Sequence, residues 1–195
     1  MSALAKTAMT LADFLAWEEH QPERHEFIDG EIFAMVGARV LHQILALNLS
    51  TTLKNKLRGT GCIVLPDGTK LQFDDNIYYP DALVTCDRTE RRNSRIEHPT
   101  LIAEVLSPST EDYDRGKKWK LYRDGLPSLQ AFLLISQEEV LVELYRRNKD
   151  GWQLSTHRDL TDEISLTHPP CSFTVADIYD DTLDLLGDQP ADATS

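Results

Sequence analysis

The sequence predicts a mixed α/β domain, in which a mixed central β-sheet is flanked by helices and preceded by an N-terminal helix and a β-hairpin. Three observations predict it. Leucines recur every four residues within 38–57, a run that is apolar on both faces occupies 100–106, and three strand-like runs follow between 129 and 157. The elements therefore come in the order helix, hairpin, long helix, mixed strands, helix and strand meander.

The first part of the chain carries clear helix and turn signals. Residues 10–19 place apolar side chains at near-helical spacing behind Thr10, a typical N-cap, with Asp13 three residues later. The pair Asp29-Gly30 separates two short apolar runs, which predicts a hairpin with strands near 25–28 and 31–36. The next helix is long and amphipathic and should end at the following glycines; its stripe comprises Leu41, Leu45, Leu49, Leu53 and Leu57.

The middle of the chain reads as strands followed by a helix. Strand-like runs at 62–65, 69–73 and 77–86 are broken by turn residues, and a polar loop that we expect to be mobile spans 87–99. The run 100–106 is apolar on both faces, as in a central strand. Ser107 to Thr110 then resembles an N-cap box, with a structural role only, for a helix running to about Arg123.

The last third of the chain reads as a strand meander. Strands are expected at 129–136, 139–147 and 151–157, with a hairpin turn at 148–151, and a short helix within 174–184. We expect one domain over 1–187 and a disordered tail over 188–195.

Composition places limits on location and partners. Apolar runs fall far short of the roughly 20 residues that a membrane span needs, and the N-terminus lacks a secretory pattern, so a cytoplasmic location without membrane contact is expected. Cys62, Cys86 and Cys171 show no metal-binding spacing and are expected to be buried reduced thiols. The net charge of -12 counts against a nucleic-acid partner, although basic residues gather at 88–95 and 114–123.

Two carboxylates interrupt strands that should otherwise be buried. Glu104 lies inside the apolar run 100–106, and Asp81 follows Pro80 at the start of another apolar run. An ionised carboxylate buried without compensation costs several kcal/mol, so each requires a cation, donors or a raised pKa. A shared magnesium ion would compensate both. The alternatives are a salt bridge or a strand-end position reached by water for Glu104, and a Pro-Asp turn for Asp81.

Helical geometry singles out one lysine. At about 100° per residue, the apolar face of the helix that ends near Arg123 lies close to Lys118 and far from Lys117 and Lys120. Lys118 is therefore predicted to point inward, toward the carboxylates. The alternative is an ordinary helical ion pair with Asp114, four residues earlier.

Several segments together resemble a known family. Tyr79-Pro80-Asp81, AEVLSPST at 103–110 and DRGKKWKLYRDGLPSLQAFLLI at 114–135 are similar to the Uma-two family of restriction-endonuclease-like proteins, within the PD-(D/E)XK nuclease superfamily. HEFIDGEI at 25–32 and VELYRRNKDGWQL at 142–154 match that layout as well. The resemblance covers most of the chain and implies a restriction-endonuclease-like core.

The resemblance also implies roles for individual residues. Asp81 and Glu104 would be the metal ligands, with the Val105 carbonyl as a third, and Mg²⁺ or its substitute Mn²⁺ as the cofactor. Leu106 stands where the superfamily pattern has lysine, and Lys118 on the following helix would replace it. The implied activity is magnesium-dependent hydrolysis of phosphodiester bonds in DNA, and a homodimer is expected by analogy with enzymes that cut two strands.

Two further residues occupy family-like positions, and other functions stay open. Glu26 is either a supporting group or the exposed face of a hairpin, and His42 is either auxiliary to the site or simply packed. The run 88–95 either contacts a nucleic-acid backbone or is a solvated face. Besides an endonuclease, the sequence allows a catalytically silent association module with the same fold, or a hydrolase of a small phosphodiester.

Overall fold

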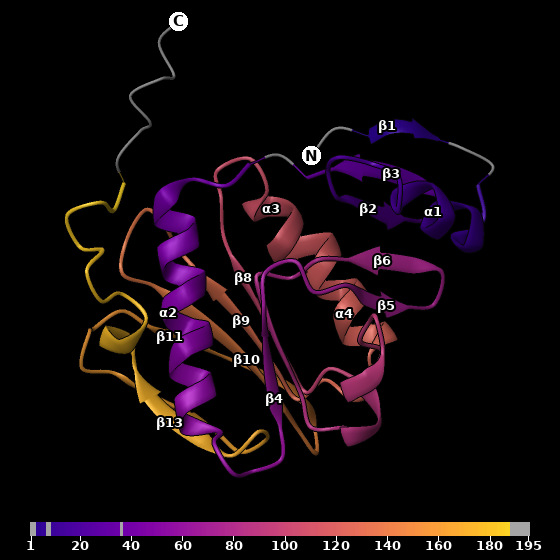
Figure 1. Cartoon of the computed structure of the whole chain (residues 1–195). Helices are drawn as coiled ribbons and strands as arrows, with labels where there is room; N and C mark the ends of the chain where they lie inside the picture. Colours follow the sequence, from indigo (N-terminus) through magenta and orange to yellow (C-terminus); the bar gives the residue numbers. More distant parts are fainter. Residues whose placement is uncertain (1–2, 7–8, 36, 188–195) are drawn as a thin grey trace, which may run out of the picture.

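The computed structural model describes residues 3–6, 9–35 and 37–187. Its centre is a six-stranded mixed sheet (Figure 1), whose strands in spatial order are β11 (Gly151–His157), β10 (Val142–Asn148), β9 (Ala131–Ile135), β8 (Leu101–Val105), β7 (Ala82–Thr85) and β4 (Ile63–Pro66). The pair β8 and β9 is parallel and the other pairs are antiparallel. The expected fold class, including β8 as a fully buried central strand, is confirmed.

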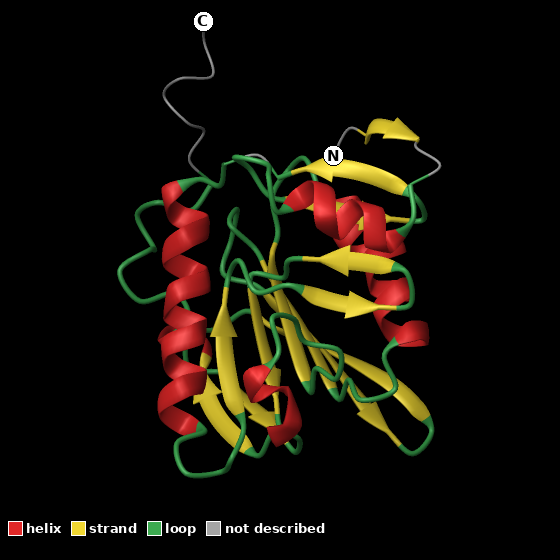
Figure 2. Ribbon diagram, turned by 45° about the vertical axis from the view of Figure 1, so that its right-hand side comes forward, coloured by secondary structure: helices red, strands yellow, loops and turns green. Residues whose placement is uncertain are grey.

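A helix covers each face of this sheet (Figure 2). On one face, the leucine stripe of α2 (Val40–Lys56) packs on alternate residues of the strands, including Val84 and Ala103. On the other face, α4 (Trp119–Gly125) packs Trp119 and Tyr122 against residues such as Phe132. Side chains at successive strand positions point to opposite faces, so Glu104 shares the α4 face with Ile102.

A second sheet, of five strands, lies beside the first and is formed by strands from the first part of the chain. In spatial order it comprises β1 (Ala3–Lys6), β3 (Glu31–Ala34), β2 (His25–Ile28), β6 (Asn76–Tyr78) and β5 (Leu71–Phe73). The helix α1 (Leu11–Glu18) packs Phe14 against Phe27 of β2. The predicted Thr10 capping box, the first helix and the hairpin are confirmed, except that β3 ends at Ala34 and Val36 lies outside the described residues.

The run 77–86 is two strands rather than the single strand that the sequence predicted. The strand β6 belongs to the five-stranded sheet and β7 to the six-stranded sheet. Between them, Pro80 has no N–H to donate to a ladder, and the N–H of Tyr79 donates to a Glu26 carboxylate oxygen instead of to a strand. This break allows Asp81 to lie at the edge of the main sheet.

The helix that follows β8 begins differently from the prediction. It comprises α3 (Glu111–Tyr113), a π-helical turn η2 (Asp114–Lys118) and α4, and its N-cap residue Thr110 makes no side-chain capping bond. Instead, the Ser107 carbonyl accepts the N–H groups of Thr110 and Glu111. A π-turn has one more residue per hydrogen-bonded turn than an α-helix, and here it ends at Lys118.

The expected mobile loop 87–99 is anchored to the protein. It begins with a 3₁₀ helix, η1 (Arg88–Arg92), in which the Glu90 side chain is buried. Glu90 accepts the backbone N–H groups of Glu97 and His98 and the hydroxyl of Thr85. The loop is therefore held at both ends by one carboxylate.

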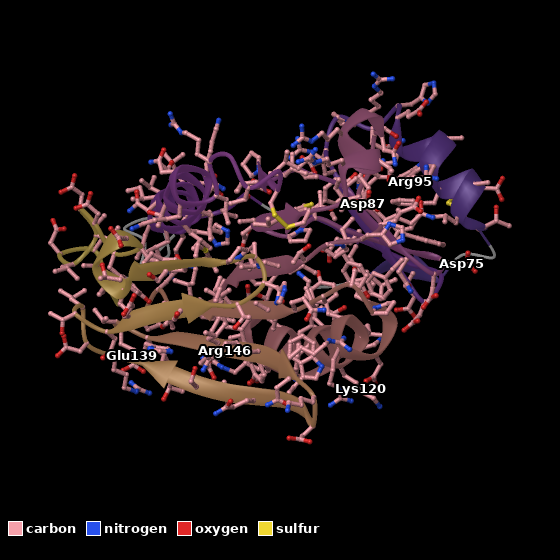
Figure 3. All side chains as sticks on the ribbon, turned by 90° about the horizontal axis from the view of Figure 1, so that it is seen from below. Asp75, Asp87, Arg95, Lys120, Glu139 and Arg146 are labelled. Atoms are coloured by element: carbon pink, nitrogen blue, oxygen red, sulfur yellow. A yellow bond between two sulfur atoms is a disulfide. The ribbon has the colours of Figure 1, made fainter. Side chains whose placement is uncertain are left out.

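The expectation of three reduced thiols is wrong, because Cys62 and Cys86 form a disulfide (Figure 3), with an S–S distance of 2.02 Å. The antiparallel pairing of β4 and β7 explains the contact. Ile63 lies opposite Thr85, so the next residues along the two strands, Cys62 and Cys86, also face each other, with 4.0 Å between their Cα atoms. Cys171 is the free cysteine.

The C-terminal part adds a two-stranded sheet that the sequence did not predict, formed by β12 (Glu163–Leu166) and β13 (Cys171–Thr174). The helix expected within 174–184 is reduced to a short 3₁₀ turn, η3 (Val175–Asp177), and the expected tail 188–195 lies outside the described residues. Over the described part of the chain, no helix is both long and apolar enough to cross a bilayer.

Candidate active site

The predicted residues lie together where β7 begins and β8 ends. Ala82 pairs with Ala103 across these antiparallel strands, and continuing the register by one residue places Asp81 opposite Glu104. The Val105 N–H donates to Asp81 Oδ2 at 2.6 Å, which fixes the Asp81 carboxylate against the neighbouring strand. The two anomalous carboxylates of the sequence are therefore neighbours.

Lys118 points inward, as the helical periodicity predicted. Its side chain is 6% exposed, and its ammonium Nζ lies 2.8 Å from Glu104 Oε1. Asp114 Oδ1 and Glu26 Oε1 lie 3.6 and 3.7 Å from the same nitrogen. By contrast, Lys117 pairs with Asp29 on the surface, where both side chains are 56% exposed.

The ion pair with Asp114 that the sequence allowed as the alternative is thus present, but it is one of three carboxylate contacts to a buried lysine. The Tyr122 hydroxyl also donates to Glu104 Oε1 at 3.0 Å. Sequence reasoning missed Tyr122, because an aromatic residue on the apolar face of a helix gives no signal that its hydroxyl reaches a carboxylate.

The two auxiliary candidates both reach the site. His42 projects from the first turn of α2, and its Nε2 lies 2.8 Å from Asp81 Oδ1. Glu26, on β2, is buried, and its second oxygen, Oε2, has no hydrogen-bond partner. Residues from β2, α2, β7, β8 and the π-helical turn therefore converge on one region.

Negative charge exceeds positive charge in this region. Four carboxylates, those of Glu26, Asp81, Glu104 and Asp114, accompany one ammonium and one imidazole. Burial raises the pKa of Glu26, and it raises the pKa of Glu104 well above the ordinary value even though Lys118 counteracts it. Burial opposes the charged form of Lys118, but the surrounding carboxylates and Tyr122 outweigh it and raise the pKa of Lys118 well above its usual value.

These residues fit a hard divalent cation in chemical type. Carboxylate and carbonyl oxygens are the ligands that Mg²⁺ prefers, and Asp81, Glu104 and the Val105 carbonyl supply them. The site holds an excess of buried carboxylates, and one Glu26 oxygen has no hydrogen-bond partner. An added cation would offset the free-energy cost of burying this negative charge. Within the described residues, no three His, Cys, Asp or Glu side chains are arranged around one point, so any such ion would need the carbonyl and water to complete its coordination.

The chain is similar to known proteins in sequence and in fold. A model of the Uma2 family, described as "Putative restriction endonuclease", matches residues 11–176. Two uncharacterised proteins of Synechocystis sp. are similar to the chain. One is 41% identical over 170 residues, covering 86% of this chain and 89% of the relative, and the other is 34% identical over 153 residues, covering 76% and 86%.

A solved structure shares the fold. The crystal structure of "a putative nuclease belonging to DUF820" from Anabaena variabilis superposes with a TM-score of 0.71 and covers 88% of this chain and 97% of its own. The sequence identity between the two chains is 17%, so the likeness concerns the fold alone.

Proposed function

The chain belongs to the Uma2 family of restriction-endonuclease-like proteins, and from this premise we propose that it is a metal-dependent endonuclease that hydrolyses phosphodiester bonds in DNA. One observation carries the proposal. Asp81, immediately before β7, lies across from Glu104 of the adjacent strand β8, and a buried lysine ammonium lies 2.8 Å from Glu104. Two carboxylates with one ammonium are the groups needed to hold a metal ion beside a phosphodiester.

Each residue of the site has a defined task. Asp81 and Glu104, with the Val105 carbonyl, would hold Mg²⁺, which supplies charge neutralisation at the phosphoryl oxygens and activates water as the nucleophile. Lys118 would contact the scissile phosphate or orient the attacking water, as a fixed positive charge whose raised pKa keeps it protonated. His42 holds one oxygen of Asp81 in place, and the Val105 N–H holds the other.

Glu26 and Tyr122 position Lys118 and Glu104. Tyr122 donates to the same Glu104 oxygen that Lys118 contacts, so this oxygen faces the helix and the second one, Oε2, is the oxygen left for an ion. Glu26 lies 3.7 Å from the Lys118 ammonium and accepts the Tyr79 N–H, which ties β2 to the break before Asp81.

Cleavage and metal binding test the proposal directly. We expect the purified protein to nick or cut plasmid DNA with Mg²⁺ or Mn²⁺ and not with a chelator, and Asp81→Asn to lose both cleavage and metal binding in calorimetric titration. Parallel reactions with RNA and a small chromogenic phosphodiester separate the substrate classes. A wild-type protein that binds neither ion and cleaves none of these substrates would instead be the silent association module.

A further inference from the structure

A second charged region lies at the far end of β7 from the carboxylates. A cavity of about 470 Å³ is lined there by the end of α2, the start of β4 and the 3₁₀ helix η1. Four cations border it, namely Lys54, Arg58, Arg88 and Arg91. From this cavity we infer a second binding site for the phosphate backbone of nucleic acid, which rests on the proposed function and extends it.

Within the described part of the chain, the four cations of this cavity have no acidic partner. Nowhere in the described residues does a carboxylate lie within 4.0 Å of any of the four, although acidic side chains outnumber basic ones in the chain, 32 to 20. Like charges that line one cavity repel each other, and an anion in the cavity would remove that repulsion. In an otherwise acidic protein, a cluster of cations around one cavity indicates a binding site for an anionic ligand.

Arginine contacts to Gly61 and a disulfide fix the shape of this cavity. Arg91 donates to the Gly61 carbonyl at 2.9 Å, and the guanidinium of Arg88 lies so close to Gly61 that a Cβ added there would meet it at 2.7 Å. Gly61 also has a φ of +93°, which other residues rarely adopt. The Cys62–Cys86 disulfide joins the two chain segments that carry these contacts.

The spacing from the active site suits a polymer rather than a small ion. Five residue steps along β7, from Asp81 to Cys86, span roughly 17 Å. Twelve steps along α2, from His42 beside Asp81 to Lys54 at the cavity, span roughly 18 Å. Successive phosphates of one DNA strand are about 3.4 Å apart along the axis, so a backbone cut at the carboxylates could reach the cavity about five nucleotides away.

The test measures binding rather than cleavage, so that it does not depend on an active nuclease. Fluorescence anisotropy of a labelled 20-base-pair duplex is recorded in chelator at several salt concentrations for wild type, for Arg58→Gln/Arg88→Gln, and for Lys120→Gln/Lys149→Gln. The second pair removes the same charge from exposed lysines outside the cavity. Both substituted arginines are exposed, and Arg91, which supports Gly61, is retained.

We expect the arginine pair to weaken duplex binding about tenfold or more and to reduce the slope of log affinity against log salt by roughly two, because two phosphate contacts are lost. The lysine pair should leave both close to wild type. Equal losses in the two pairs, or no duplex binding by wild type, would overturn the inference. So would inorganic phosphate that competes with the duplex at equal concentration, since the cavity would then hold a small anion. If the arginine pair loses duplex binding and wild type cleaves no substrate, the cavity is a backbone-binding site but the proposed nuclease activity is wrong.

Discussion

His42 Nε2 lies 2.8 Å from Asp81 Oδ1, so the first turn of α2 is joined to the carboxylate that immediately precedes β7. Burial of the imidazole opposes its charged form, but the hydrogen bond and the negative charge of Asp81 outweigh this and raise the pKa of His42 above its ordinary value of 6.5. His42 is therefore more protonated in the folded chain than in the unfolded chain near neutral pH.

Linkage gives this pair a defined pH dependence. Because the folded pKa of His42 is raised, its stabilising contribution is complete below pH 6.5 and is lost as the pH rises through the folded pKa. We expect His42→Gln, which retains a donor but does not titrate, to show a smaller fall in melting temperature above pH 6.5 in the presence of chelator. His20→Gln, at an exposed histidine, is the control and should follow wild type. Parallel curves for all three proteins would contradict the prediction.

Lys118 should be required for both stability and cleavage. Lys118→Met leaves Glu104 buried without its ammonium, and breaking a buried pair from one side costs about 3–5 kcal/mol. Lys120→Met, on the exposed face of α4, should change the free energy of unfolding by less than about 0.5 kcal/mol. Chemical denaturation and plasmid cleavage measured on both variants test this. If Lys118→Met cleaves plasmid DNA as fast as wild type does, Lys118 has no role in catalysis.

The meeting of these candidate residues was predictable, because each of them violates a local rule. A carboxylate in a fully buried strand and a lysine on the apolar side of a helix are visible in the sequence without any contact information. Lys118 was also predicted to point inward from simple periodicity, although a π-turn lies in that helix. The π-turn ends at Lys118, whereas the apolar positions used for the prediction all follow it.

Features that depend on long-range pairing were not predictable. The disulfide requires β4 to pair with β7 across the intervening β5–β6 hairpin, and no local pattern specifies that neighbour. The division of 77–86 between two sheets also depends on Glu26, which lies some fifty residues earlier and accepts the Tyr79 N–H. Pro80 alone indicated either an edge strand or a break between two strands, and the sequence did not distinguish the two.

The disulfide should contribute measurable stability. Cys62 and Cys86 are 24 residues apart, and closing a loop of this length stabilises the fold by about 3 kcal/mol in the chain-entropy model. We expect a reductant to lower the melting temperature of wild type and to leave that of Cys62→Ser/Cys86→Ser unchanged. Thiol titration of the denatured, unreduced protein should give one thiol, from Cys171. Three titratable thiols would show that the two cysteines are reduced.

Glu26 gives the sharpest test of the charge excess. Burial raises its folded pKa above the ordinary 4.5, although Lys118 counteracts this, so the folded protein binds more protons than the unfolded chain above about pH 4.5. With the unfolded state releasing its proton first, stability falls as the pH rises from 4.5 to the folded pKa and stays low beyond it.

Replacing the carboxylate should remove this cost. In chelator at neutral pH, we expect Glu26→Gln to melt above wild type and to lose less stability between pH 4.5 and 7, because Lys118 retains Glu104 and Asp114 as partners. Glu23→Gln, at an exposed position three residues earlier, should leave the curve unchanged. Added Mg²⁺ should still stabilise Glu26→Gln by linkage, since Asp81 and Glu104 remain. If Glu26→Gln melts well below wild type at every pH, Glu26 acts as a required partner of Lys118, and the cluster holds no surplus negative charge for a metal ion to neutralise.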